Sequence, residues 1–385
     1  MRLIRCIGLG ASFNTVSLRR RRQLPRLSPD RQPANMTSKR PVTHKDIARQ
    51  LGISQSTVSR ALDPLHRHLI SAAVVEKILK LSEESGFQGN ILARRLRNQR
   101  TETITLVIPS TVFRAPRNID FEIGNHLLPW RQVAGHMHAA NQAGYDVKLV
   151  PQAGTTPADD AALLAQMGFP HSDGVVFCGH RTVPCDLSPL KNRGVPYIIT
   201  STFPKDDWRP LISFDQGPGI KIALEHLFSL GHRRVACLAF SEEFTTSELW
   251  MPRYQTWLTT MQNAGYYEPS LLIQCFTEQD LRMLLAKYAN KLPFTAVYCA
   301  NDITAHRLVK ELVHLGIRVP TDVAVVGFDN NILFHQVTPR LSTIDLPLEA
   351  LGRRASEALI QAIEGKADIP ELLLLPTTFE RHDTA

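Results

Sequence analysis

Polar side chains of the kinds that bind DNA gather in one short stretch of the sequence, PVTHKDIARQLGISQSTVSRALD, between Pro41 and Asp63. Its second half carries an amide, several hydroxyls and a guanidinium group, which suit base edges and phosphate oxygens. These residues are Gln55, Ser56, Thr57, Ser59 and Arg60. The chemistry that this stretch indicates is recognition of DNA.

Two short helices are predicted to position these side chains. Thr43 and Asp46 have the spacing of a capping box, which begins a first helix, and Gly52 ends it because an exit turn needs positive φ. Ser54 then caps a second helix. Apolar residues follow at helical spacing on the inward faces: Ile47, Ala48, Leu51, Val58, Ala61 and Leu62. Two helices joined by a glycine turn predict a helix-turn-helix, and the alternative is a capped helical hairpin that binds no DNA.

A third helix is predicted from its cap, Ser71, to about Ser85, with Gly86 as its stop. It completes a three-helix core. The short basic segment that follows, 90–97, is partly apolar and too short to be a stable helix alone in water. We expect this segment to fold on DNA.

The positive charge is confined to the first quarter of the chain. The first 100 residues hold 20 basic and 6 acidic residues, and the remaining 285 hold 24 and 30. This asymmetry is typical of a DNA-binding head on a domain with another role. Residues 1–40 have no hydrophobic periodicity and are predicted to be a disordered basic extension, although Met36 is an alternative start.

Several classes of protein are disfavoured by what the sequence lacks. The six cysteines have no paired spacing, which predicts buried thiols in a reducing cytosol. His136 and His138 are two residues apart and would not share a helix face, so they make a poor metal pair. There is no apolar run of 18 residues and no nucleophile elbow, P-loop or metalloprotease motif. We therefore expect no membrane span, no metal, no cofactor and no enzymatic activity.

From Thr103 onward, apolar runs alternate with amphipathic helices. The predicted strands are 104–109, 147–150, 174–177, 197–200, 211–214, 235–240, 296–300 and 323–328. The predicted helices are 135–143, 158–167, 217–230, 253–264, 279–290, 305–315 and 348–364. This alternation predicts an α/β body with parallel sheets of βαβ units. About 280 residues are many for one open sheet, so we expect two subdomains with a cleft between them.

Residues 42–381 resemble the LacI/GalR (lac repressor) family. Besides the head, four segments recur in the order and spacing of that family: GHRRVA at 231–236, ANDITA at 300–305, VPTDVAVVGFDN at 319–330 and TPRLSTID at 338–345. The resemblance implies a small all-α helix-turn-helix DNA-binding domain and a periplasmic-binding-protein-like α/β effector domain of two parallel-sheet subdomains.

The resemblance also implies domain limits. They are a basic extension (1–40), the helix-turn-helix domain (41–88), a hinge helix and linker (89–101) and a ligand-binding and dimerisation domain (102–385). The subdomains of the last are expected at about 102–201 with 347–368, and 202–346 with 369–385.

In the head, the resemblance implies that Gln55 and Ser56 read base edges and that Leu96 of the hinge helix enters the minor groove. The DNA-contacting residues are then Thr43, Ser54, Gln55, Ser56, Thr57, Ser59, Arg60, Asn90, Ala93 and Leu96. Gly89 departs from the family because a proline is usual before the hinge helix.

In the body, the resemblance places Arg253, Asn301 and Asp329 where the family binds a ligand's hydroxyls or charged atoms. Asn301 has a second interpretation as a helix cap, and Arg253 as part of a surface salt bridge. Five aromatic residues are candidates to stack on a sugar ring or, alternatively, to belong to the core: Phe113, Trp130, Phe203, Trp250 and Phe328. Of these, Phe113 is the one that we expect to contact the ligand. The chain departs from relatives at Asp345 and Leu346, and in a longer segment over 110–130.

The function implied is a cytoplasmic, nucleoid-associated homodimer that binds a near-palindromic operator and a small-molecule effector. Precedent in the family favours a repressor of carbohydrate-utilisation genes that a sugar-type inducer releases. The alternatives are a nucleobase-type corepressor, or a degenerate cleft that senses a partner protein. No leucine heptads follow Arg381, which disfavours a coiled-coil tetramer.

Overall fold

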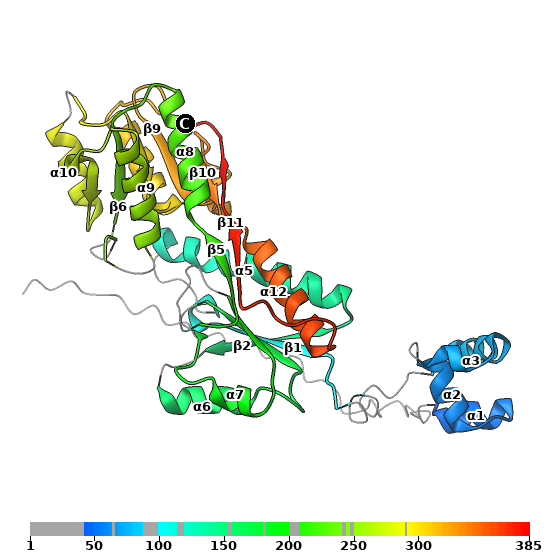
Figure 1. Ribbon diagram of the computed structural model, residues 1–385. Coiled ribbons are helices and arrows are strands. Elements are labelled where there is room, and N and C mark those ends of the chain that lie inside the picture. The colour runs from blue at the N-terminus through cyan, green and yellow to red at the C-terminus, as the bar shows by residue number, and fades with distance from the viewer. Residues whose placement is uncertain are drawn as a thin grey trace, which may run out of the picture. The chain divides into compact units, whose positions relative to one another are not determined.

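A computed structural model of the chain describes residues 42–63, 66–87, 95, 99–113, 119–152, 156–179, 182–200, 208–240, 244–246, 250–288 and 291–385. At 111, 113 and 119–127 only the backbone is described. The chain divides into two compact units, Met1–Asn90 and Ile91–Ala385 (Figure 1). The expected basic extension and the hinge residues Asn90, Ala93 and Leu96 lie outside the described residues.

The first unit contains the predicted helix-turn-helix. Its helices are α1 (His44–Leu51), α2 (Gln55–Leu62), the 3-10 helix η1 (Arg67–Leu69) and α3 (Ala72–Glu84). Gly52 has the expected positive φ of 65°, and the Asp46 carboxylate accepts from the Thr43 amide at 2.9 Å. Ser71 lies at the N-cap of α3 but accepts no capping bond through its side chain. The small core joins all three α-helices through Ile47, Ala48, Val58, Ala61, Val75 and Ile78.

The second unit contains two six-stranded sheets. The first sheet has the order β11-β5-β4-β3-β1-β2, and all of its paired strands are parallel. Its strands are β1 (Thr103–Pro109), β2 (Asp146–Gln152), β3 (Gly174–Cys178), β4 (Tyr197–Thr200), β5 (Leu211–Asp215) and β11 (Leu372–Pro376). The helices of this part are α5 (Ile119–Gln142), α6 (Pro157–Ala165), α7 (Ser188–Asn192) and α12 (Leu348–Ile363), with the 3-10 helix η2 (Ser110–Phe113).

Alternate residues of the first sheet pack on its two faces, as strand geometry requires. Leu106 and Val176 belong to the large core that includes α12, whereas Val107, Val175 and Phe177 pack with leucines of α6 and α7. The sheet is therefore covered on both sides.

The second sheet has the order β12-β10-β9-β8-β6-β7, in which only β12 pairs antiparallel. Its strands are β6 (Val235–Ala239), β7 (Leu272–Gln274), β8 (Ala296–Cys299), β9 (Ala324–Asp329), β10 (Ser342–Asp345) and β12 (Thr378–Glu380). Its helices are α8 (Gly217–Ser229), α9 (Met251–Asn263), α10 (Glu278–Lys287) and α11 (Asp302–His314), with short 3-10 helices η4 (Pro269–Leu271) and η5 (Ile332–Phe334).

The chain crosses between the two sheets at three places: after β5, between β10 and α12, and between β11 and β12. The sequence places 202–346 and 369–385 in the second subdomain, but β5 and β11 pair with each other in the first sheet. The first and third crossings therefore fall later than expected. These two are joined by Thr377, whose hydroxyl donates to the Asp215 carbonyl at 3.0 Å and accepts from the Gly219 amide at 3.0 Å.

The largest error in the predicted elements concerns the start of the first body helix. The helix expected at 135–143 begins at Ile119 and contains Pro129, so the second half of the longer segment over 110–130 is helical. The sequence pattern also missed β7, β10, β11, β12 and α7. Among the described residues, no helix is long and apolar enough to cross a membrane.

Candidate functional site

The recognition surface of the head is built by α2 and its cap. Ser54 accepts the Thr57 amide at 3.1 Å, and its hydroxyl also bonds the hydroxyls of Ser56 at 2.7 Å and Thr57 at 2.8 Å. Gln55, Ser56 and Arg60 are exposed, whereas Thr57 is half-buried. The first turn of α2 therefore presents an amide and a set of linked hydroxyls on a backbone that is already ordered.

Two other residues expected to contact DNA, Thr43 and Ser59, have structural surroundings of different kinds. Thr43 caps α1 through Asp46, and its hydroxyl donates to the carboxylate at 2.6 Å. Ser59 is half-buried on α2, next to Val58, which is fully buried and anchors the helix. Roles in DNA contact stay predictions for all of these side chains.

The three polar ligand residues expected in the body lie at the carboxyl ends of the second sheet's strands (Asn301 and Asp329) and on α9 (Arg253). Arg253 is 4% exposed. Its Nε donates to Gln216 Oε1 at 2.8 Å, Nη1 donates to the Ala300 carbonyl, and Nη2 donates to Asp329 Oδ1 at 3.3 Å. Its guanidinium lies 3.7 Å from the centre of the Phe328 ring. The alternative interpretation of Arg253 as a surface salt bridge is wrong because the side chain is enclosed by the sheet edge.

Asp329 is the last residue of β9 and is 8% exposed. Its φ is 114°, and that of Asn330 is 47°, so the chain turns through two residues of positive φ at the sheet edge. Burial raises the pKa of Asp329 to about 6, although Arg253 opposes the rise. The cluster therefore holds a carboxylate whose proton equilibrium lies near neutral pH.

Asn301 is the N-cap of α11 and accepts the Thr304 amide through Oδ1 at 2.8 Å. The capping interpretation is confirmed, and a ligand contact stays a prediction. The next residue, Asp302, accepts the Asn331 amide at 2.7 Å and the hydroxyl of Thr343, and burial raises its pKa well above the usual range. These bonds fix the loop that follows β9.

Glycine is required beneath this loop. A Cβ atom on Gly327 would lie 2.2 Å from a carboxylate oxygen of Asp302. A side chain at this position of β9 would displace the buried carboxylate and release the bonds that it accepts.

The aromatic candidates do not form one stacking platform. Phe328 is fully buried under Arg253 and belongs to the core. Trp250 is half-buried, with its ring centre 4.9 Å from the Arg253 guanidinium, and Trp130 is 38% exposed. Phe113 is described only by its backbone in η2, and Phe203 lies outside the described residues.

Two residues of the cluster had no signal in the sequence. Gln216 is 3% exposed and holds Arg253 from the first crossing. Tyr298, in β8, is fully buried, and its hydroxyl has no hydrogen-bond partner within the described part of the chain. Burial raises the pKa of Tyr298, while the nearby charge of Arg253 lowers it. An unpaired buried hydroxyl beside Arg253 and Asp329 is a further candidate contact for a polar ligand.

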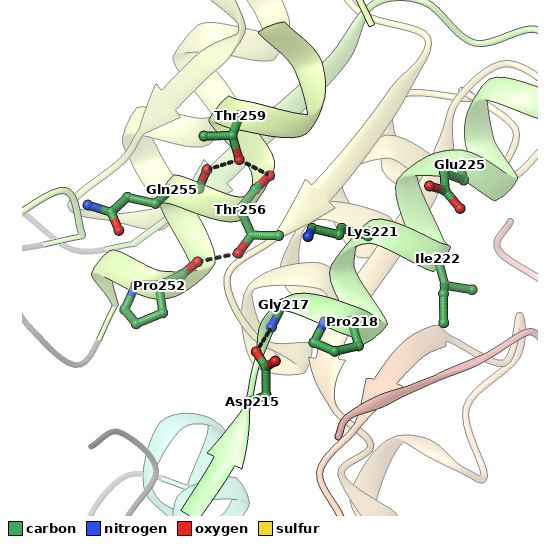
Figure 2. A pocket seen from close by; sticks show the side chains of 10 residues that line it. All are labelled: Asp215, Gly217, Pro218, Lys221, Ile222, Glu225, Pro252, Gln255, Thr256 and Thr259. Atoms are coloured by element: carbon green, nitrogen blue, oxygen red, sulfur yellow. Dashed lines mark hydrogen bonds between the residues drawn. The ribbon is translucent and has the colours of Figure 1, made fainter. Parts of the chain in front are cut away.

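An open groove of about 660 Å³ lies next to this cluster, between α8 and α9 (Figure 2). Charged residues Asp215, Lys221 and Glu225 border it, and Pro252, the neighbour of Arg253 in the chain, also lines it. None of the expected ligand residues lines the groove. Among the residues that the structure describes, no group of three His, Cys, Asp or Glu side chains is arranged to hold a metal ion.

A helix-turn-helix head and a two-sheet α/β body with a buried polar cluster define an HTH-type transcriptional regulator with a binding-protein-like body. Comparisons with known proteins agree. The family described as periplasmic binding protein-like domain matches residues 224–384. The NTD biosynthesis operon regulator NtdR of Bacillus subtilis (strain 168) is 26% identical over 339 residues, which cover 87% of this chain and 97% of NtdR.

Solved structures show the same fold. A complex of the transcriptional regulator CelR with cellobiose is 25% identical, with a TM-score of 0.56, and covers 89% of this chain and 100% of CelR. The lac repressor dimer bound to operator and the anti-inducer ONPF is 22% identical, with a TM-score of 0.64, and covers 89% and 99%. Over most of its length the chain is similar to regulators of the LacI family, and the relatives it matches are transcriptional regulators rather than enzymes.

Proposed function

We propose that this protein is a homodimeric repressor that binds a near-palindromic operator and releases it on binding a small polyhydroxylated effector, a sugar or sugar derivative. The observation that carries the proposal is the Arg253–Asp329 pair, enclosed at a sheet edge between two crossings of the chain. Such a pair serves no structural need that an apolar contact would not meet, because buried ion pairs contribute little net stability.

The chemistry of the cluster favours hydroxyl groups as the ligand's polar atoms. A carboxylate accepts from two hydroxyls, a guanidinium donates, and an amide such as Asn301 does both. Arg253 contacts one carboxylate oxygen, Oδ1, of Asp329. CelR, a relative of similar length, has been solved with cellobiose, which supports a sugar over the nucleobase-type corepressor and the partner-protein alternatives.

Exposed apolar residues support a homodimer. On α5, Trp130 and Met137 are two helical turns apart on one face and are 38% and 54% exposed. In the second subdomain, Phe276 precedes α10 and Met283 lies on it, with 61% and 56% exposure. Contact with a second copy would remove these side chains from water. Sedimentation of the purified chain tests this part of the proposal.

The effector is best sought by a thermal-shift screen of sugars, sugar acids, sugar phosphates and nucleobases. A saturable shift with a sugar that is lost in Asp329→Asn and retained in Asp322→Asn supports the site. Asp322 is a suitable control because it forms an exposed ion pair with Arg318. A saturable shift that survives Asp329→Asn would move the effector to another site, and a nucleobase hit would favour the corepressor alternative.

The DNA-binding role is tested by selecting operator sequences with the full chain. Arg60→Ala should reduce discrimination between the selected operator and random DNA. Lys80→Ala removes the same charge from an exposed position on α3 and should reduce binding to both DNAs alike. Equal discrimination by the two variants would contradict the assignment of α2 as the recognition helix.

The remaining parts of the proposal follow the family. The domain limits at 41–88, 89–101 and 102–385, the hinge contacts of Asn90, Ala93 and Leu96, and a cytoplasmic, nucleoid-associated location belong to it. Reporter expression from the selected operator, with and without the chain, distinguishes a repressor from an activator.

A further inference from the structure

A second polar cluster lies next to Asp329, at the ends of β9 and β10. Arg131 of α5 donates through Nη2 to Asp345 Oδ1 at 3.0 Å and through Nη1 to the Asn330 carbonyl at 3.4 Å. The Asn330 side-chain amide donates to the same Asp345 oxygen at 2.8 Å, and its Oδ1 bonds His335 Nε2 at 2.8 Å. Four side chains are thus joined through one carboxylate and one amide.

This cluster connects the two sheets. Arg131 follows the first sheet because its neighbour Gln132 is buried and donates to Thr200 of β4 at 2.6 Å. Asp345 is the last residue of β10 and Asn330 directly follows β9, and both strands belong to the second sheet. The ion pair is therefore made between residues that different sheets hold in place.

Asp345 also stands at a crossing. It ends β10, and the chain passes from it through two residues into α12, which packs on α5 and on the first sheet. The arrangement of the two sheets can change only by movement at such crossings. A contact from α5 to Asp345 therefore restrains one crossing.

The cluster is next to the candidate effector residue. Asn330 follows Asp329 directly, and both hold positive φ. The charge of Arg131 also acts on the pKa of Asp329, which places the two side chains near each other. A ligand that moves Asp329 would therefore move Asn330 and strain its bonds to Asp345 and Arg131.

We propose that Arg131, Asp345 and Asn330 form a clamp across the second crossing that stabilises the arrangement of the two sheets shown here, and that an effector bound at Asp329 acts against this clamp. The second half of this proposal rests on the proposed function. The first half concerns the body alone and holds without DNA or ligand.

The test measures the distance between the sheets in the full chain. Spin labels are attached to Ala161→Cys on α6 and Gln255→Cys on α9, which are both exposed. Cys185, which is exposed, and Cys6 are both replaced by serine so that they take no label. The other four cysteines are buried and are kept. Labelled chain is mixed with excess unlabelled chain, so that a dimer containing a labelled chain carries only one pair of labels. Double electron–electron resonance then gives the distance distribution within that chain.

Arg131→Gln and Asp345→Asn should each populate a second distance, with its share raised by up to roughly fivefold, the usual limit for a partly exposed ion pair. The matched control is Arg282→Gln, which removes an ion pair of α10 with Glu311 of α11, within one subdomain. Its distribution should equal that of the wild type. Asp345→Asn retains an oxygen that accepts from the Asn330 amide. The proposal can therefore still be tested with this variant if Arg131→Gln does not fold.

Wild-type distributions in both clamp variants would overturn the proposal. So would the same broadening in Arg282→Gln, because the effect would then be general loosening. The measurement contains no DNA and no effector. A failed operator selection with altered distances would therefore reject the proposed function and retain the clamp, and the reverse result would reject the clamp alone.

Discussion

Replacement of Asp329 by asparagine should make the protein more stable at neutral pH while it removes the effector response. Burial raises the pKa of this carboxyl from 3.8 to about 6, so its ionised form is disfavoured in the fold despite Arg253. Asparagine has the same shape as the protonated acid and is among the residues that best tolerate a positive φ, here 114°. Stability and binding should therefore change in opposite directions.

The size and sign follow from linkage. A carboxyl whose pKa is raised on folding contributes stability that is fully present below pH 3.8 and is lost as the pH rises through about 6. The rise corresponds to about 3 kcal/mol, and about 1.4 kcal/mol of it is recovered on going from pH 7.5 to pH 5. The side chain that Asp329→Asn introduces does not titrate, so the difference in unfolding free energy between the two proteins should change by that amount.

The assay is urea unfolding of both proteins from pH 5 to pH 7.5, with the two curves subtracted at each pH. Most other titrating groups are unchanged between the two chains and cancel. The charge of Asp329 also raises the pKa of Asp302, so removing that charge adds to the same trend with pH. The advantage of Asp329→Asn should grow as the pH rises. A difference that is constant over this range, or that grows as the pH falls, would refute the reasoning that this carboxyl is held against its ionisation.

Three further outcomes follow from packing, burial and capping. A Cβ atom on Gly352 would lie 2.0 Å from the Gln132 carbonyl, so Gly352→Ala should separate α12 from α5 and cost about 3 kcal/mol in urea unfolding. Burial lowers the pKa of His136 to about 3, so its stabilisation is present above pH 6.5 and is lost as the pH falls, by about 1.4 kcal/mol per unit; His136→Gln should flatten this slope. Ser54→Ala should destabilise the head by about 1 kcal/mol and speed hydrogen exchange in α2.

The sequence pattern predicts the head almost completely because its signals are local. The cap at Ser54, the positive φ of Gly52 and the apolar faces of α1 and α2 are all decided within a few residues. The helix boundaries in the structure agree with them. Ser71 is the exception, since its position at the N-cap does not require its hydroxyl to accept a bond.

The body is predicted less well at its edges. The missed strands β10 and β12 are short and lie at one side of the second sheet, where pairing rather than hydrophobicity defines them. The start of α5 was missed in a segment that contains Pro129, because an interior proline removes a backbone hydrogen bond and usually kinks or ends a helix. The sheet membership of β11 depends on its pairing with β5, which lies more than 150 residues earlier in the chain, and no local pattern contains that pairing.

The site residues illustrate the same division. Asp329 was indicated by its place after a strand, and Asn301 by its place before a helix, both of which are local signals. Gln216, Tyr298 and Arg131 carry no such signal because their roles arise from contacts made across the fold. Asp345 was visible as a departure from relatives, but its partner Arg131 was not.

The contacts of the cluster suggest how a ligand at a buried site could act on the arrangement of the sheets. Arg253 is bonded to Gln216 at the crossing after β5, and Asn330, next to Asp329, is bonded to Asp345 at the crossing after β10. Both ends of the Arg253–Asp329 pair are therefore tied to segments at which the two sheets can move. Under the proposed function, an effector that replaces Arg253 as the partner of Asp329 changes the contacts at both crossings at once. A small shift at the sheet edge can therefore favour a different arrangement of the subdomains.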